Sequence, residues 1–259
     1  MSKHIPRKRF GQHFLCDHDI IAAIIQAIRP LDTDNLVEIG PGLGALTRPL
    51  LQHIPHLQVI ELDRDIVARL QRTYPAETLA VHAADALNFD FATLGGDLRI
   101  VGNLPYNIST PLLFHLAGFA TRIIDIHVML QKEVVDRMTA VPDTHDYGRL
   151  SVMLQYRFDM EALFEVPPDA FDPPPKVDST VVRMIPRRAD AAQPDDPAEL
   201  ARIVSSAFSQ RRKTLRNTLA GILKPADFTQ LEIDPQRRAE TVSVADFIRI
   251  ANFVTKEKS

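Results

Sequence analysis

Short apolar runs alternate with helical segments along the first half of the chain, and this alternation limits the folds that the chain can adopt. Runs typical of buried strands lie at 35–39, 57–62, 79–82, 98–101 and 123–130. In the neighbouring segments, apolar residues recur every three or four positions, which predicts helices at 17–29, 45–54, 108–119 and 132–139 and one that Asp63 caps. Strands that alternate with helices build a mostly parallel sheet with helices on both faces. The sequence therefore predicts an α/β fold.

The second half of the chain has a different pattern. Two β-rich segments at 150–158 and 177–185 are expected to complete the sheet. Residues 187–198 are rich in Pro, Ala and Asp and are expected to form a linker. After the linker the pattern is purely helical, at 200–208, 214–223 and 244–254. We therefore expect a larger domain at 1–186, the linker at 187–198 and a small helical domain at 199–259.

The distribution of charge restricts the classes of partner. The net charge is −3, but residues 1–16 carry +4, residues 17–186 carry −10 and residues 187–259 carry +3. Basic ends on an acidic body can bind a polyanion, whereas the isoelectric point near 6.3 argues against indiscriminate nucleic-acid binding. No apolar run approaches the roughly 20 residues that cross a bilayer, so no membrane association is expected. A single cysteine, Cys16, excludes an internal disulfide and fits a cytoplasmic protein.

A glycine-rich turn, Gly40-Pro-Gly-Leu-Gly44, follows the first expected strand of the sheet. Glycines let the backbone turn tightly and approach a ligand, and Glu61, after the next strand, can accept hydrogen bonds from both hydroxyls of a ribose. The turn also satisfies the pattern of nicotinamide dinucleotide sites. Glu38 favours S-adenosylmethionine instead, because a carboxylate attracts its ammonium and sulfonium groups and repels a pyrophosphate. Asp85, after the third strand, fits an acceptor for the adenine amine of that cofactor.

The segment Asn103-Leu-Pro-Tyr106 follows the fourth expected strand, where ligands bind in open α/β sheets. The amide oxygen of Asn103 can accept a hydrogen bond from an amino group. Pro105 favours extended backbone at Leu104, whose carbonyl can then act as a second acceptor. Tyr106 offers a flat face on which a base can stack. Two acceptors beside an aromatic ring suit the exocyclic amine of a planar base, and hydride transfer has no use for them.

Six segments together resemble the small-subunit (16S) ribosomal RNA adenine N6-dimethyltransferases, namely 7–15, 37–44, 59–65, 102–111, 171–179 and 210–217. The resemblance implies a class I Rossmann-like methyltransferase sheet with a small C-terminal all-helical domain. It also implies S-adenosylmethionine as cofactor and dimethylation of two adjacent adenines in the 3′-terminal hairpin loop of 16S ribosomal RNA during small-subunit assembly. The cofactor contacts that it implies are His13, Leu15, Gly40, Glu61, Asp85 and Asn103. His13 departs from the family, which often has Asn there.

The catalytic residues are expected to be Asn103, Leu104, Pro105, Tyr106 and Phe171. Phe171 precedes a stiff run of three prolines, which can present its ring to the base opposite Tyr106, although the ring can equally fill the core. Two basic clusters are expected to contact RNA: Arg7, Lys8 and Arg9 near the N-terminus, and Arg211, Arg212, Lys213 and Arg216, of which Arg212 and Arg216 would share a helix face. We expect a monomer without a metal ion.

Three other functions compete with this interpretation. The 23S ribosomal RNA adenine methyltransferases are close relatives, although the versions of segments 171–177 and 210–216 found here favour the 16S class. A non-catalytic RNA-binding assembly factor would keep the same fold, but intact Asn103, Tyr106 and Glu61 favour an enzyme. A nicotinamide-dependent oxidoreductase would be identified by the cofactor that raises its melting temperature.

Overall fold

The computed structural model describes residues 13–188 and 191–258. The basic residues Arg7, Lys8 and Arg9 therefore lie outside the described part of the chain. The chain divides into two compact units. The first runs up to Val135 and includes Met160–Pro186, and the second consists of Asp136–Asp159 and the chain from Arg187 onward.

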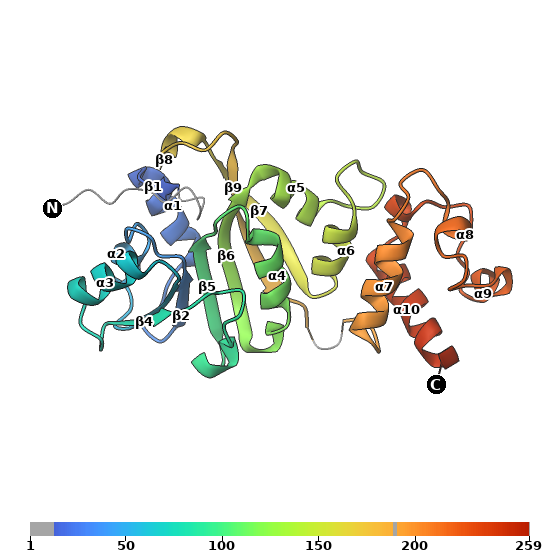
Figure 1. Cartoon of the computed structure of the whole chain (residues 1–259), viewed down its shortest axis with the longest axis horizontal. Coiled ribbons are helices and arrows are strands. Elements are labelled where there is room, and N and C mark those ends of the chain that lie inside the picture. Colours follow the sequence, from blue (N-terminus) through green and yellow to red (C-terminus); the bar gives the residue numbers. More distant parts are fainter. Residues whose placement is uncertain (1–12, 189–190, 259) are drawn as a thin grey trace. The chain divides into compact units, whose positions relative to one another are not determined.

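A sheet of seven strands, in the order β4-β3-β2-β5-β6-β9-β7, forms the centre of the larger unit (Figure 1). The strands β2 to β6 run parallel to one another, and β9 runs antiparallel to β6. The near-continuous apolar sequences of β2, β3 and β5 reflect burial on both faces. The α/β sheet predicted from the sequence is confirmed. The strands are β2 (Asn35–Ile39), β3 (Leu57–Glu61), β4 (Leu79–Ala83), β5 (Leu98–Asn103), β6 (Ile123–Gln131), β7 (Phe158–Val166) and β9 (Ser179–Pro186).

Helices connect the parallel strands and lie around the sheet (Figure 1). Asp17 and Asp63 cap two of them, because each side chain accepts hydrogen bonds from main-chain N–H groups of the first turn. One helix, which contains Pro49 near its start, is shorter than the predicted 45–54 and ends at Leu50. The helices are α1 (His18–Ile28), α2 (Thr47–Leu50), α3 (Arg64–Thr73), α4 (Ser109–Ala117) and α5 (Lys132–Thr139).

A second, two-stranded sheet joins segments that are far apart in the sequence. In it, β1 (Phe14–Leu15) pairs antiparallel with β8 (Phe171–Asp172), so that Phe14 faces Asp172 and Leu15 faces Phe171 in register. The main-chain N–H of Cys16 extends the contact by donating to the Ala170 carbonyl at 2.9 Å. The start of the described chain is thereby fixed against the proline-rich segment before β9.

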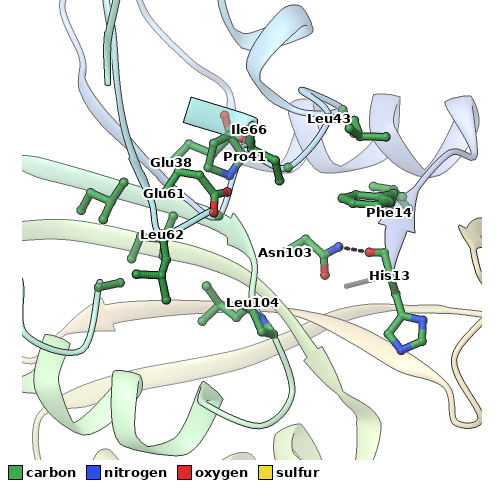
Figure 2. Close-up of a pocket in the computed structure, with 18 of the residues that line it drawn as sticks. His13, Phe14, Glu38, Pro41, Leu43, Glu61, Leu62, Ile66, Asn103 and Leu104 are labelled. Carbon is green, nitrogen blue, oxygen red and sulfur yellow. Dashed lines mark hydrogen bonds between the residues drawn. The ribbon is translucent and has the colours of Figure 1, made fainter. Parts of the chain in front are cut away.

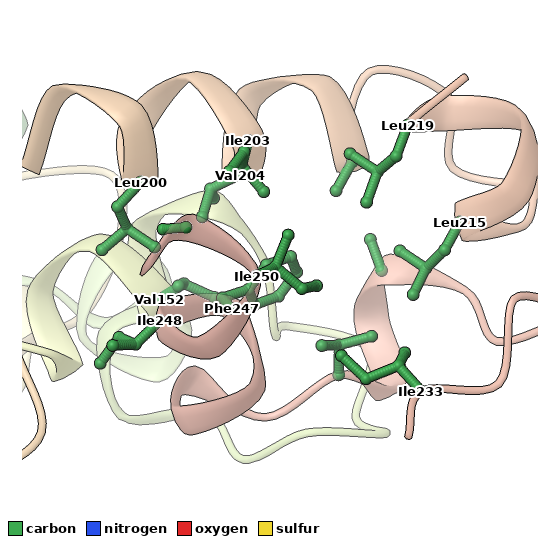
Figure 3. Packing of buried hydrophobic residues seen from close by; sticks show 14 of the residues in the cluster. Val152, Leu200, Ile203, Val204, Leu215, Leu219, Ile233, Phe247, Ile248 and Ile250 are labelled. Carbon is green, nitrogen blue, oxygen red and sulfur yellow. The ribbon is translucent and has the colours of Figure 1, made fainter. Parts of the chain in front are cut away.

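The helical unit has its own apolar core (Figure 3). The core is built from α6 (Arg149–Gln155), α7 (Pro197–Ala207), α8 (Leu215–Thr218), α9 (Pro225–Gln230) and α10 (Val244–Lys258). Figure 3 shows Val152, Val204 and Phe247 converging in it, and all three are fully buried. Because Tyr147, Val152 and Tyr156 belong to this core, residues 136–159 pack with the C-terminal helices, whereas the sequence had placed them in the larger domain.

Two further expectations are corrected in this part of the chain. The segment 150–158, expected to be a strand, forms α6, and the strand follows as β7. A short apolar run buried on several sides has no periodicity that separates helix from strand, and β7 is an edge strand rich in acids, which hides its pattern. The helix predicted at 214–223 is reduced to α8, which ends at Thr218, and the chain turns further on at Gly221, which has a φ of +85°.

Candidate active site

A cavity of about 1060 Å³ opens in the larger unit at the carboxyl ends of β2, β3 and β5. The strand order reverses between β2 and β5, since β3 and β4 follow on one side and β6 on the other. Ligands bind at this switch point in open α/β sheets, because the connections leave the two strands in opposite directions. Figure 2 shows Glu38, Glu61, Asn103, Phe14 and Leu104 around the cavity. The volume suits a ligand of drug or cofactor size.

The glycine turn forms one wall of the cavity. Gly40 and Gly42 adopt φ values of +67° and +53°, which side-chain-bearing residues rarely adopt. A Cβ atom at Gly42 would lie 3.2 Å from the Phe14 ring, so a glycine there also lets β1 approach the turn. The Gly40 N–H donates to the Ile60 carbonyl at 3.0 Å and fixes the turn against β3.

Two buried carboxyl groups line the cavity beside this turn. Glu38 is 2% exposed, and its Oε2 accepts a hydrogen bond from Thr47 Oγ1 at 2.6 Å. Burial raises the pKa of Glu38 to about 7, and the nearby charge of Glu61 adds to the increase. Glu61 accepts from the Asp63 N–H at 2.7 Å, and burial raises its pKa as well. Acids desolvated in this way favour a cationic ligand and disfavour a pyrophosphate.

Asp85 lies at the same edge of the sheet, just beyond the end of β4. It lines the cavity and is half-buried. Its carboxylate accepts from the Leu87 N–H at 3.0 Å and from Asn88 Nδ2 at 3.2 Å, and these bonds fix its orientation. A carboxylate held in this way can accept a further hydrogen bond from an amine in the cavity.

Asn103 ends β5 and points into the cavity (Figure 2). Its Nδ2 donates to the His13 carbonyl at 3.1 Å. A carbonyl can only accept, so the amide nitrogen has to face His13, and no described residue donates to Oδ1. The next residue, Leu104, is buried, and its N–H donates to the Met129 carbonyl at 3.2 Å. Pro105 lines the cavity after it.

Tyr106 lies at the same end of the cavity, and contacts at both its hydroxyl and its ring hold it. The hydroxyl is 2.7 Å from Ser179 Oγ on β9. The ring stacks on that of His13, with centroids 5.8 Å apart and planes inclined by 24°. Burial raises the pKa of Tyr106, so the phenol stays neutral at physiological pH. Asn103, Leu104, Pro105 and Tyr106 are thus brought together, and His13, Leu15, Gly40, Glu61 and Asp85 line the same cavity.

The structure corrects the position expected for Phe171. Its side chain is only 3% exposed and packs in the core with Leu15 and Val181, and it does not line the cavity. The strand pairing of β8 with β1 holds the ring inward. The apolar residues Phe14, Leu43 and Leu62 line the cavity instead, and the sequence had not assigned them to it. In the sequence, each of them is next to a residue of a predicted site motif, and only this position could have indicated that they line the cavity.

The four basic residues of the helical unit that were expected to contact RNA are all exposed, namely Arg211, Arg212, Lys213 and Arg216. They do not share a helix face, however, because α8 begins only at Leu215 and the first three lie in the preceding turn. Arg211 donates to the His145 carbonyl at 3.0 Å. In the described ranges, no helix is long and apolar enough to span a membrane.

The sequence model of the ribosomal RNA adenine dimethylase family matches residues 3–256. A protein of Thiobacillus denitrificans named ribosomal RNA small subunit methyltransferase A is 63% identical over 251 residues, which are 97% of this chain and 98% of that protein. A protein of the same name from Chromobacterium violaceum is 60% identical over 253 residues, which are 97% of each chain.

Solved structures show the same architecture. The crystal structure of a dimethyladenosine transferase from Plasmodium falciparum matches with a TM-score of 0.80 and 25% identity, over 95% of this chain and 98% of that one. The 23S ribosomal RNA methyltransferase ErmE matches with a TM-score of 0.72 and 23% identity, over 93% and 99% of the two chains. The likeness shows that the fold is that of the class I methyltransferases.

Proposed function

The chain belongs to the ribosomal RNA adenine dimethylase family, and from this premise we propose that it dimethylates N6 of adenine in small-subunit ribosomal RNA, with S-adenosylmethionine as methyl donor. One observation carries the proposal. The glycine turn, the buried acids and the segment from Asn103 to Tyr106 line one cavity at the switch point of the sheet. A cofactor and a base bound there would be neighbours.

The residues present fit S-adenosylmethionine. We assign the ribose hydroxyls to Glu61, the adenine amine to Asp85 and the close backbone approach to Gly40, with Leu15 and Asn103 as further contacts. Glu38 and Glu61 make the cavity favourable for a cation, and Leu62, which is half exposed in it, offers an apolar surface to a ring. When bound, the cofactor supplies a methyl group on a positively charged sulfur and leaves as a neutral thioether.

Catalysis then depends mainly on the position of the amine. Asn103 Oδ1 and the Leu104 carbonyl each accept a hydrogen bond from one N–H group of the adenine amine. Together these two hydrogen bonds aim the lone pair of the amine nitrogen at the methyl group. Asn103 is already oriented for this task, because its Nδ2 is bound to the His13 carbonyl. Holding two reacting groups in line lowers the entropic part of the barrier without acid–base chemistry. After the first transfer the nitrogen carries a positive charge and releases one proton to water, so one N–H remains and a second transfer can follow.

The base has to leave its stack to reach the cavity. This costs a few kcal/mol, and less in a loop than in a duplex. Stacking on Tyr106 recovers about 1–3 kcal/mol. The bond from the Tyr106 hydroxyl to Ser179 Oγ supports this role, because it fixes the plane of the ring before the base arrives.

We assign the substrate to two adjacent adenines of the 3′-terminal hairpin loop of 16S ribosomal RNA, within a small subunit that is still being assembled. The sequence motifs and the high identity to small-subunit methyltransferases support this choice over 23S ribosomal RNA. The helical region 199–259 and the N-terminal basic residues Arg7, Lys8 and Arg9 would contact the RNA. We propose that the enzyme acts as a cytoplasmic monomer.

The variant Asn103→Ala tests the function. Small subunits and 23S ribosomal RNA, both purified from cells lacking the methyltransferase, would be incubated with labelled S-adenosylmethionine and analysed by mass spectrometry. We expect two dimethylated adenines in the 16S hairpin loop, and a rate about 100-fold lower for the variant, since it loses one acceptor that holds the amine. Gln71→Ala, on the exposed surface of α3, is the control and should keep the wild-type rate. Label in 23S RNA alone, or an undiminished rate for Asn103→Ala, would refute the proposal.

A further inference from the structure

Thr47 holds the buried carboxyl group of Glu38 in the wall of the cavity. The Thr47 hydroxyl donates to Glu38 Oε2 at 2.6 Å, and Thr47 interacts with this carboxyl group through its main chain as well. Thr47 is fully buried and is the first residue of α2, which closely follows the glycine turn. The acid at the end of β2 is therefore held by the helix that follows the turn.

The surroundings of Glu38 contain a second acid but no cation. Glu61, at the end of β3, lies near enough for its charge to oppose that of Glu38, and Figure 2 shows the two side chains next to each other. Within the described chain, the interactions of the Glu38 carboxyl group are with Thr47 and Glu61. Arg69 and His13 also line the cavity, but neither is among these interactions.

A buried acid without a cationic partner retains its proton to a higher pH than an exposed one. Burial raises the pKa of Glu38 to about 7, and the bond from Thr47 limits this increase. Near neutral pH the free protein is therefore a mixture of molecules with a neutral and an ionised Glu38. A cation that enters the cavity is attracted to the carboxylate much more strongly than to the neutral acid, so it binds to the ionised form.

We propose that a proton and the cationic cofactor compete for Glu38, and that Thr47 shifts the balance toward the cofactor by donating to the carboxylate. This inference rests on the proposed function, because it takes S-adenosylmethionine, with its ammonium and sulfonium groups, as the ligand. When the cofactor binds, the proton on Glu38 leaves for the solvent. Thr47 is a positioning residue in this scheme, since it acts on the cofactor only through the carboxylate that it orients.

The number of protons released on binding measures this competition directly. Calorimetry with S-adenosylmethionine in two buffers of different protonation enthalpy gives that number, together with the affinity at each pH. Glu38→Gln is the reference, because the amine of the cofactor, Glu61 and His13 are present in both titrations. We expect the wild type to release about half a proton more than Glu38→Gln at pH 7. Between pH 7.5 and pH 6 its affinity should fall about eightfold further than that of the variant.

Two substitutions of Thr47 test the hydrogen bond. Thr47→Val keeps the shape of the side chain but loses the donor, so Glu38 retains its proton to a higher pH. We expect this variant to release more protons than the wild type at pH 7 and to bind the cofactor about threefold more weakly there. Thr47→Ser keeps the hydroxyl and should behave like the wild type. The control is Thr229→Val, an exposed threonine on α9 of the helical unit, which should also match the wild type.

Equal proton release by the wild type and Glu38→Gln would overturn the inference. So would a Thr47→Val variant that matches Thr47→Ser in proton release and affinity at every pH, because the hydroxyl would then have no influence. Should Thr47→Val not fold, Thr47→Ala takes its place, since it also lacks the donor. Failure of the proposed function differs from all of these results, because the wild type would then bind no S-adenosylmethionine at any pH.

Discussion

At the scale of single residues, Glu38 has the most unusual environment in the cavity. Its carboxyl group is almost fully buried, accepts a hydrogen bond from Thr47 and lies near a second acid, Glu61. Its pKa of about 7, against an ordinary value of 4.5, means that the native protein without a ligand holds a proton that the unfolded chain releases. The group thus destabilises the free protein when it ionises, which is expected of a carboxylate kept for a cationic ligand.

We predict that Glu38→Gln stabilises the free protein at alkaline pH and not at acidic pH. Between pH 4.5 and about 7 the native wild type binds more protons than the unfolded chain, so its free energy of unfolding falls as the pH rises and then levels off. The fall corresponds to about 3 kcal/mol, and the glutamine variant lacks it. Urea unfolding at pH 5 and pH 8.5 measures the difference between the two proteins, and Glu61 is present in both. The same difference at both pH values would contradict the prediction.

At the scale of elements, the close approach of β5 to β2 places Asn103 beside the glycine turn. Gly102 makes this approach possible, because a Cβ atom at that position would lie 2.5 Å from the Ile39 carbonyl oxygen. In the register of β2 and β5, Glu38 lies opposite Val101. The glycine turn after β2 and the segment that begins at Asn103 after β5 therefore leave the sheet at the same level. A side chain on Gly102 would have to push apart two buried backbone segments.

We predict that Gly102→Ala destabilises the protein by about 1–3 kcal/mol, as overpacked sites do, and impairs methylation by displacing Asn103. Gly96→Ala is the matched control, because a Cβ atom at Gly96 would meet no atom within 4 Å. Chemical unfolding of both variants gives the two free energies. Equal stability of Gly102→Ala and Gly96→Ala would show that the two strands can separate at no cost.

At the scale of the whole molecule, attraction to RNA has to come from local clusters of charge, because the chain as a whole carries −3. The exposed cluster of the helical unit consists of Arg211, Arg212, Lys213 and Arg216. Three of these four side chains leave a turn and not a helix, so they can reach separate phosphates.

We predict that replacing Arg211, Arg212 and Lys213 together by Ala makes RNA affinity less dependent on salt, so that log affinity falls less steeply with log salt concentration. Each lost phosphate contact reduces the magnitude of this negative slope by roughly 0.7–0.9, so we expect the triple variant to reduce it by about 2. The control replaces three exposed basic residues elsewhere by Ala, namely Arg64, Arg72 and Lys224. Filter binding of the RNA at several salt concentrations gives the slopes. An equal reduction of the salt dependence in both triple variants would disprove a specific role for the cluster.

The sequence by itself determined the α/β fold and the site motifs. Strands β2 to β6 are close to their predicted bounds, because periodicity and glycine turns are local signals. The motifs with Gly40, Glu61, Asp85 and Asn103 were found for a related reason, since the carboxyl ends of parallel strands share one edge. Local patterns of this kind do not depend on which distant segment packs against them.

Only the tertiary structure decided which aromatic ring meets Tyr106 and where residues 150–158 belong. Phe171 and His13 are far from Tyr106 in the sequence, and the pairing of β1 with β8 turned one ring into the core and left the other in the cavity. Similarly, α6 is a helix because the C-terminal core receives its side chains. These outcomes depend on contacts between distant segments, whose packing overrides local preference, and a single sequence does not encode them in any nearby pattern.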